Sequence, residues 1–387
     1  MKKRLLIGLT VIGAGMLAAL LLSRPRPEII AYQGKSITDW VRQSCAADQK
    51  SREQAVGAFQ TLGSNAVPGL VRLLAARDSF FRRQIWSFAP SLPKPLRLIV
   101  LGRVRAPDAA SIRTAAARSL AVIGPDAQAA VPALAQALRS GDARLRWDAA
   151  GALSHIGKPG LPELASALAD KDPAVRRAAA SALGDLGPDA TVAAPALLKA
   201  LGDQYDYVRV AAASSFSKLG TNVLPFLLQE ISSGDSLARQ RAAIGLGLLR
   251  GPREILLPPL LELLQDHDPV CRAQAIQTLA AFNFPNPTMV AAFIASVKDP
   301  VLEIRLAAIQ ALANARWQAA PAVSALNDCL DDPSAPIRES AARALGAIGK
   351  RAKPALPELA RLADDTEERV RAAAKEAVTK IQGAASK

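Results

Sequence analysis

The sequence predicts an all-α protein built as an α-solenoid, an array of stacked helical hairpins. Two observations predict this fold class. Alanine and leucine dominate the 387 residues and aromatic residues make up only 4%, which favours helices over a β-sandwich or barrel. In addition, the phrase DPAVRRAAASALGDLG at residues 172–187 returns at residues 332–349 as DPSAPIRESAARALGAIG, and weaker copies lie around both. A catalytic motif is needed once, so a phrase that recurs indicates a structural unit.

One arginine occupies the same place in every copy of the phrase. From the second of these arginines onward, neighbours are 30 or 33 residues apart, and the three-residue difference falls in the loop within a hairpin. Such a regular period is typical of a solenoid. The repeat arginines are Arg52, Arg113, Arg146, Arg176, Arg209, Arg239, Arg272, Arg305, Arg338 and Arg371.

Each unit is predicted to contain two helices. In the copy that starts at Asp172, apolar residues at Ala179, Leu183 and Leu186 recur with helical spacing and form one face of the first helix. Gly187 is predicted to end this helix, and a proline eight residues later opens the second helix at a position where its missing N–H has no intrahelical partner. Small alanines allow neighbouring first helices to approach closely.

An aspartate precedes many of the repeat arginines by four residues. Asp172 is expected to cap its helix, and Arg176 is expected to reach back to it or across to the acidic loop of the adjoining repeat. The same pairing is available at Asp142, Asp235 and Asp268. Because the pairs recur from unit to unit, we interpret them as structural staples between repeats and not as active sites.

These residues resemble HEAT repeats, in particular the short bacterial variety also found in phycobilin lyases, whose consensus is close to DxxxVRxxAAxALGxIG followed by a proline-led helix. The resemblance covers about residues 48–78 and 108–383. It implies a right-handed superhelix of about ten hairpins, with the first helices on the convex face and the second helices on the concave face. The sequence departs from the pattern at Arg250, Asn283 and Arg316, where the helix-ending glycine is absent.

The amino terminus is predicted to be one hydrophobic helix that anchors the protein in a membrane. Residues 5–22 carry no charge and are flanked by Lys2–Arg4 and by Arg24, and eighteen helical residues rise about 27 Å, close to the thickness of the hydrocarbon layer. We therefore expect a signal anchor at residues 1–27, with secretion after signal cleavage as the alternative. The charges favour a cytoplasmic amino terminus, so a bacterial protein would be single-pass in the inner membrane with its body in the periplasm.

The remaining chain is expected to divide into two parts. Residues 28–47 are predicted to be a linker and a capping helix, and residues 48–387 form the solenoid. An irregular repeat is expected at residues 79–110, where prolines interrupt the helical pattern and aromatic residues such as Trp86 and Phe88 gather. This segment is either a degenerate repeat that packs its aromatic side chains against the array, or a protrusion that faces a partner or a membrane.

The residues that carry chemistry are few and scattered. The cysteines, Cys45, Cys271 and Cys329, and the histidines, His155 and His267, match no zinc-binding spacing, so the cysteines are expected to be free thiols or buried small hydrophobic residues. No catalytic residue, cofactor, metal or small-molecule substrate is predicted. The formal net charge is +14, but second-helix positions alternate in sign and form no basic stripe, which argues against nucleic-acid binding.

The sequence therefore predicts a non-enzymatic, membrane-tethered scaffold that binds another protein. Four aromatic residues at predicted surface positions are candidates for partner binding, although each ring could instead cover a neighbouring loop: Trp147, Tyr205, Tyr207 and Phe226. Two alternatives stay open. One is a lyase or lyase-accessory protein of the phycobilin-lyase type, and the other is a nucleic-acid-binding HEAT-like protein.

Overall fold

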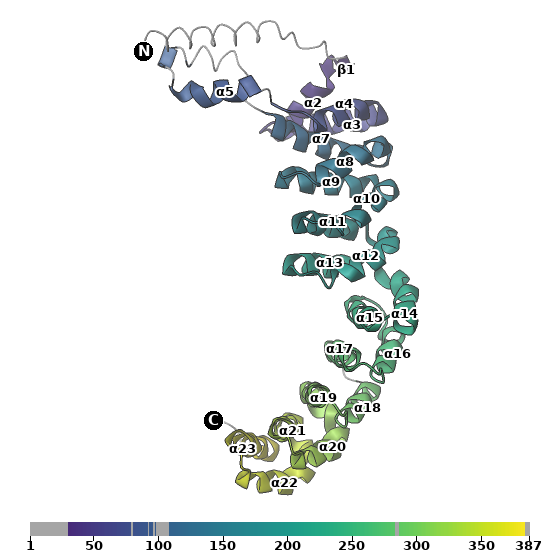
Figure 1. Ribbon diagram of the computed structural model, residues 1–387, viewed down its shortest axis with the longest axis vertical. Helices are drawn as coiled ribbons and strands as arrows, with labels where there is room; N and C mark the ends of the chain where they lie inside the picture. The colour runs from purple at the N-terminus through teal and green to yellow at the C-terminus, as the bar shows by residue number, and fades with distance from the viewer. Residues whose placement is uncertain are drawn as a thin grey trace. The chain divides into compact units, whose positions relative to one another are not determined.

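The computed structural model describes residues 30–78, 80–91, 93–95, 97, 108–282 and 286–383. The chain divides into two compact units, Met1–Ala193 and Ala194–Lys387, called here the first and the second unit. Helices make up nearly all the regular structure of the described residues, which confirms the all-α prediction (Figure 1). The exception is a short antiparallel hairpin of β1 (Ile30–Tyr32) and β2 (Lys35–Ser36), which the sequence did not predict.

The first unit begins with α2 and continues as helical hairpins joined by 3₁₀ segments. Its helices are α2 (Ile37–Ser44), α3 (Gln49–Leu62), η1 (Gly63–Ala66), α4 (Val67–Leu74), α5 (Phe80–Phe88), η2 (Ala89–Ser91), α7 (Ala109–Ile123), η3 (Gly124–Ala130), α8 (Val131–Leu138), α9 (Ala143–Ile156), η4 (Lys158–Gly160), α10 (Leu161–Ala167), α11 (Pro173–Leu186) and η5 (Gly187–Ala193).

The second unit repeats the same alternation. Its helices are α12 (Ala194–Ala200), α13 (Asp206–Lys218), η6 (Gly220–Val223), α14 (Leu224–Ser233), α15 (Ser236–Leu248), α16 (Arg253–Leu263), α17 (Pro269–Ala280), α18 (Pro287–Ser296), α19 (Leu302–Ala315), η7 (Arg316–Ala322), α20 (Val323–Asp328), η8 (Cys329–Asp331), α21 (Ala335–Ile348), η9 (Gly349–Ala355), α22 (Leu356–Arg361), η10 (Leu362–Asp364) and α23 (Glu368–Gln382).

Every repeat arginine lies on the first helix of its hairpin, either in the first turn or just beyond that turn. We call these the arginine helices: α3, α7, α9, α11, α13, α15, α17, α19, α21 and α23. The predicted helix signals act as expected. The side chains of Asp142, Asp172, Asp235 and Asp268 accept hydrogen bonds from backbone N–H groups of the helices they precede. Gly187 ends α11 with a positive φ of 56°, a conformation that favours glycine.

Apolar side chains are buried between hairpins. In α17 and α19, for example, Ala275, Leu279, Ala308 and Leu312 are fully buried. Each hairpin packs mainly on the hairpins beside it, as α9 packs on α7 and α11 in the first unit. A single hairpin cannot bury its apolar face alone, so stacking supplies the core. The solenoid of helical hairpins is therefore confirmed, while its right-handed sense stays a prediction.

The resemblance placed the arginine helices on the convex face, and this placement is wrong for the second unit. Within this unit the arginine helices lie on the inner side of the curve and the second helices on the outer side (Figure 1). The physical reason is side-chain size. On α21, a Cβ placed on Gly346 would lie 3.0 Å from the Cα of Ala377 on α23, so these two arginine helices approach closely. The second helices instead bury larger side chains, such as Leu260.

The predicted membrane location is contradicted. In the part of the chain that the structure describes, no helix is long and apolar enough to cross a membrane. The longest helices there, α7 and α23, have 15 residues each, short of the roughly 20 that a bilayer requires, and both carry charged side chains. We therefore withdraw the assignment to the inner membrane. The predicted anchor itself, residues 5–22, lies outside the described residues.

Two segments flank the first hairpin. In α2, Ser36 and Asp39 form a capping box and Trp40 is buried, and the role of residues 28–47 as a linker and capping helix stays a prediction. Farther along, α7 packs directly on α3 and α4, so α5 does not lie between them in the stack. Phe80 and Phe88 are 62% and 64% exposed, whereas Trp86 is half-buried, so both interpretations of residues 79–110 stay open.

Candidate protein-binding surface

Arginine–aspartate pairs connect successive repeats of the second unit. Arg272 Nε and Nη2 donate to both carboxylate oxygens of Asp299, 27 residues further on, at 2.8 and 3.0 Å. Arg338 binds Asp365 at 2.8 and 2.9 Å, and the corresponding pair of Arg239 with Asp266 has distances of 2.6 and 3.1 Å. Planar two-point pairing of this kind is stronger and more directional than a single contact. We call the set of these pairs the arginine ladder.

Each ladder arginine also holds the turn in front of its own helix. Nη1 of Arg272 donates to the carbonyl oxygens of Asp266 and His267 at 2.8 and 3.2 Å. The partner aspartate is equally engaged, because a carboxylate oxygen of Asp299 accepts from the backbone N–H of Val301 at 2.9 Å. One guanidinium therefore ties its own turn to the turn of the next repeat, and the side chains of Arg272 and Asp299 are only 12% and 10% exposed.

The ladder is weaker at two other repeat arginines of the second unit, Arg305 and Arg209. Arg305 reaches Asp332 only at 3.6 Å. Arg209 has a serine, Ser236, 27 residues further on and pairs instead with Asp206 of its own helix. Of the other repeat arginines, three donate to carbonyl oxygens of their own turns: Arg52, Arg176 and Arg371. Arg146 reaches Asp172 at 3.5 Å. The buried Nε of Arg113 has no hydrogen-bond partner in the part of the chain described.

The sequence left open whether the arginines reach back within their own repeat or across to the next one. In the second unit, Arg239, Arg272 and Arg338 reach across. The carboxylate that they meet lies in the acidic loop of the adjoining repeat, six residues before the next arginine. The aspartate at minus four, such as Asp268, caps its own helix instead.

The ladder determines how the aspartates titrate. Burial by itself would raise the pKa of Asp299, but the hydrogen bonds from Arg272 and from the N–H of Val301 outweigh it and hold the pKa below its usual range. The pKa of Asp365 is lowered mainly by its hydrogen bonds from Arg338. Reciprocally, the carboxylate raises the pKa of the Arg272 guanidinium. Both partners stay ionised over the whole neutral range.

Acid will destabilise the folded protein through these carboxylates. Their pKa values are lower in the folded than in the unfolded chain, so their stabilisation is complete above the unfolded value of about 3.9 and is lost as pH falls through the folded value. Urea unfolding at pH 5 and at pH 3 will show this loss, and Asp299→Asn will show a smaller difference between the two conditions. An equal difference in the variant and the parent protein would contradict the assignment.

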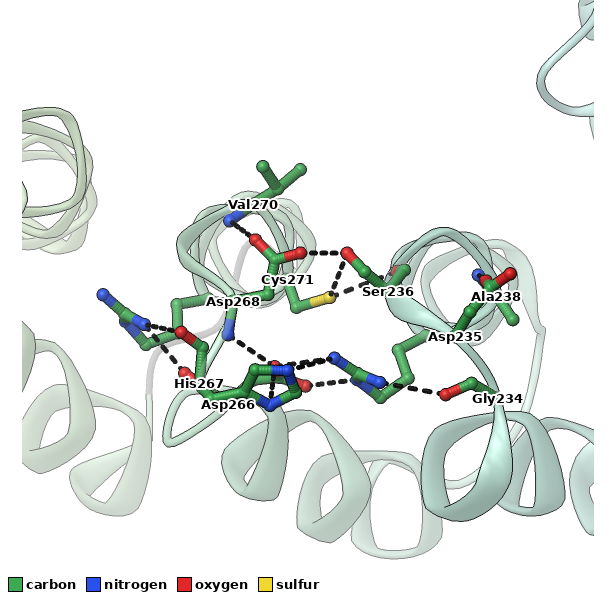
Figure 2. Close-up of polar contacts among 11 residues, drawn as sticks. Gly234, Asp235, Ser236, Ala238, Asp266, His267, Asp268, Val270 and Cys271 are labelled. Carbon is green, nitrogen blue, oxygen red and sulfur yellow. Dashed lines mark hydrogen bonds and ion pairs between the residues drawn. The ribbon is translucent and has the colours of Figure 1, made fainter.

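A cluster of polar residues between α15 and α17 contains serine, cysteine, histidine and aspartate (Figure 2). The Ser236 hydroxyl donates to the Asp268 carboxylate and lies 3.8 Å from Cys271 Sγ, which donates to the Ser236 carbonyl at 3.3 Å. The imidazole of His267 contacts Asp266 and Arg239, both at 3.3 Å, and neither the serine nor the cysteine.

This cluster lacks the geometry of a nucleophilic site. Burial raises the pKa of the Cys271 thiol, and the side chain is fully buried, so little reactive thiolate forms at neutral pH. The His267 ring is 83% exposed and turned to the ladder, so it cannot serve Ser236 or Cys271 as a base. The cluster connects two repeats. All three cysteines are free, as predicted.

The other residues that could carry chemistry are dispersed. A ring nitrogen of His155 lies 2.7 Å from the carbonyl oxygen of Gly151 in the last turns of α9. Burial raises the pKa of Cys329 to about 11. Within the described ranges, no group of three or more histidine, cysteine, aspartate or glutamate side chains could hold a metal ion.

The four predicted partner-binding residues lie in three places. Trp147 on α9 is 40% exposed, and the Arg177 guanidinium lies 5.4 Å from its ring centroid. Tyr205 and Tyr207 lie at the start of α13, 40% and 39% exposed, with ring centroids 5.5 Å apart. Phe226 on α14 is half-buried. The structure therefore brings only the two tyrosines together.

The sequence analysis missed apolar residues that share the repeat position of Tyr207. This position lies two residues before the repeat arginine, and in the next two arginine helices it holds Leu237 and Val270, each 49% exposed. Trp317, 58% exposed in the loop after α19, was also missed. Comparison of equivalent positions along the array, and not a search for aromatic residues alone, would have found the first group.

Comparison with known proteins agrees with the repeat geometry. A family model described as HEAT repeats matches residues 131–217, 224–313 and 290–379, which together make up more than half of the chain. The chain belongs to the HEAT-repeat family. The match does not distinguish the phycobilin-lyase variety, which stays a prediction. No curated protein matches this HEAT-repeat protein.

Solved structures with a similar fold share little sequence with this HEAT-repeat protein. An engineered protein is 20% identical, with 89% of this chain and 98% of that chain covered and a TM-score of 0.35. Kap121p is 17% identical, with 89% and 44% covered and a TM-score of 0.45, and importin beta is 16% identical, with 90% and 55% covered and a TM-score of 0.39. The chain therefore spans less than half the length of Kap121p.

Proposed function

We propose that this HEAT-repeat protein is a non-enzymatic scaffold that binds another protein along the arginine helices of its second unit. The observation that carries the proposal is a row of exposed apolar side chains at one repeat position. Tyr207, Leu237 and Val270 lie on α13, α15 and α17 and are 39%, 49% and 49% exposed. We call these three residues the apolar row.

The row is a consequence of the repeat. Equivalent positions in stacked helices are about 10 Å apart, so side chains of this size form a continuous surface. Tyr205 and Val210, 40% and 68% exposed, extend it on α13. Beyond α17 the same position holds Glu303, which limits the row to three repeats. Contiguous apolar surface of this kind is typical of protein-interaction sites, where tyrosine is a frequent anchor.

The residues predicted from sequence enter this proposal unequally. Tyr205 and Tyr207 are proposed as anchors of the partner. Trp147 belongs to the first unit and is proposed as a separate contact, because its ring stays 40% exposed beside Arg177. The half-buried Phe226 is better explained by packing within its hairpin.

Site-specific photo-crosslinking tests the proposal. We expect a crosslinkable phenylalanine analogue at position 237 or 270 to give one discrete protein adduct in cells, and the same analogue at Glu262, exposed on the second helix α16, to give none. Tyr207→Ala will abolish the adduct while it changes the free energy of unfolding by less than about 0.5 kcal/mol, because the side chain is at the surface. Equal adducts at 237 and 262 would refute the proposal.

A further inference from the structure

A second exposed surface lies at the opposite end of the arginine helices, in the loops after α19 and α21 that contain the 3₁₀ segments η7 and η9. These loops carry four cations and one tryptophan, which together we call the Trp317 patch: Arg316, Trp317, Lys350, Arg351 and Lys353. All five side chains are exposed. No acidic residue occurs between residues 314 and 327 or between residues 344 and 357. The patch is therefore a local concentration of positive charge.

Among the described residues, none of the four cations of the patch forms an ion pair with a carboxylate within 4.0 Å, whereas the ladder arginines at the other helix ends are paired with aspartates. By contrast, Lys380 on α23 binds Glu376 at 2.7 Å. Unpaired cations concentrated on one surface attract an anionic ligand.

Trp317 connects the two loops. The Arg351 guanidinium lies 4.8 Å from the centroid of the indole ring, and Arg351 Nη1 donates to the Trp317 carbonyl at 3.2 Å. The ring nevertheless stays 58% exposed. An arginine beside an exposed indole can donate two hydrogen bonds to a carboxylate, while the indole provides an adjacent apolar surface. This combination is common at binding hot spots.

The backbone at Arg316 shows that this residue is unfavourable for the fold. It ends α19 with φ 51° and ψ −129°, a conformation that other arginine helices reach with glycine, as Gly187 and Gly349 do. A side chain at positive φ is strained, and such strain is concentrated at functional sites. Glycine would serve the fold better, so the presence of arginine here is consistent with a role in binding.

We propose that the Trp317 patch binds an acidic segment of the partner protein, with carboxylates on the cations and an apolar side chain against the indole. The inference rests on the proposed protein-binding function. Two neighbouring loops about 10 Å apart are spanned by about three residues of an extended segment, so a short acidic segment can contact both. Nucleic acid fits less well, because phosphate recognition needs a longer basic track.

Peptide binding to the full chain tests this assignment. The probe is a fluorescein-labelled peptide of about eight residues, glutamates with two leucines, measured by anisotropy at about 50 and about 200 mM NaCl. We expect salt-sensitive binding that becomes about 10-fold weaker in Trp317→Ala and in Arg351→Ala. Lys375→Ala, which removes an exposed cation on α23 outside the patch, will have no effect. Binding of a glutamine version with the same affinity would overturn the proposal.

Arg316→Gly separates binding from stability. We expect this variant to melt roughly 1–2 °C higher, because the strain at positive φ is relieved, and to bind the peptide about 3-fold more weakly. If the variant is more stable but binds the peptide with the same affinity as the parent protein, Arg316 is not part of the site.

Two further outcomes would also overturn the assignment. Duplex DNA of about 20 base pairs that binds more tightly than the peptide at the same salt would assign the patch to nucleic acid. Self-association of the chain that is lost in Arg351→Ala would assign the patch to a second copy. If the peptide does not bind but the protein crosslink at position 237 persists, only the proposal for the Trp317 patch is wrong, and the proposed function stands.

Discussion

Replacement of Arg272 by alanine will lower the free energy of unfolding by about 3 kcal/mol. The variant leaves the Asp299 carboxylate, 10% exposed, without its two guanidinium donors, and it removes the bonds to the carbonyl oxygens of Asp266 and His267. The main penalty is a buried charge without a counter-ion and not the absence of an attractive pair. Urea denaturation followed by circular dichroism measures the loss.

Arg371→Ala is the matched control. Arg371 donates to carbonyl oxygens of Asp365 and Thr366 in the same way, but it belongs to the last described repeat and pairs with no carboxylate among the described residues. We expect this variant to lose about 1 kcal/mol, the usual contribution of such hydrogen bonds. If Arg272→Ala and Arg371→Ala lose the same amount, the pairs between repeats do not stabilise the array.

Replacement of Gly346 by leucine will destabilise the protein by about 3 kcal/mol. A Cβ at this position would lie 3.0 Å from the Cα and 3.2 Å from the Cβ of Ala377. Backbone cannot move aside as the end of a flexible side chain can, so α21 and α23 must separate and lose contact along their length. Thermal and urea unfolding both report the effect.

Replacement of a glycine with free space around it is expected to stabilise the protein instead. A Cβ on Gly151, in the middle of α9, would lie more than 4 Å from every atom outside its chain neighbours and the backbone of its own helix turn. Gly151→Ala therefore removes backbone freedom from the unfolded chain without a clash and will stabilise the protein by about 0.5–1 kcal/mol. Destabilisation by both substitutions would show that helix spacing is not the reason for the effect at Gly346.

Local signals in the sequence predicted much of the fold. Asp142, Asp172 and Asp268 cap helices because a short acidic side chain reaches the N–H groups of the first turn, and this depends only on neighbours in sequence. Gly187 and Gly349 end helices for an equally local reason. The regular step between arginines predicted the stacked hairpins because stacking requires equal units.

Features that depend on contacts between repeats were predicted less well. The arginine pairs with the aspartate six residues before the next arginine, because the turn of the next repeat brings that residue, as at Asp299, opposite the guanidinium. Which helices lie on the inner side of the second unit depends on how closely neighbouring helices approach, as at Gly346. The resemblance predicted the second helices there, but the arginine helices occupy the inner side. Arg316 was noted as a departure, yet only coordinates show that its backbone keeps the glycine conformation.

The candidate surfaces were predicted only in part. Tyr205 and Tyr207 were chosen because large aromatic rings at predicted surface positions are typical interface anchors, but Leu237 and Val270 are ordinary residues in sequence and become notable only through exposure at equivalent positions. Trp317 is similar, since its pairing with Arg351 involves two loops that are 34 residues apart. The predicted anchor at residues 5–22 depended on the length of an uncharged run and on its flanking cations, and no helix in the described ranges spans a membrane.

The central claim is that each hairpin is stabilised mainly by its neighbours through buried alanine and leucine contacts and the arginine ladder. Hydrogen exchange of Arg272→Ala, followed by mass spectrometry, tests it most directly. The account predicts faster exchange in α17, in α19 and in the second helices beside them, with unchanged protection in α7 and α9. Equal loss of protection along the whole chain, as in a protein with one shared core, would contradict it.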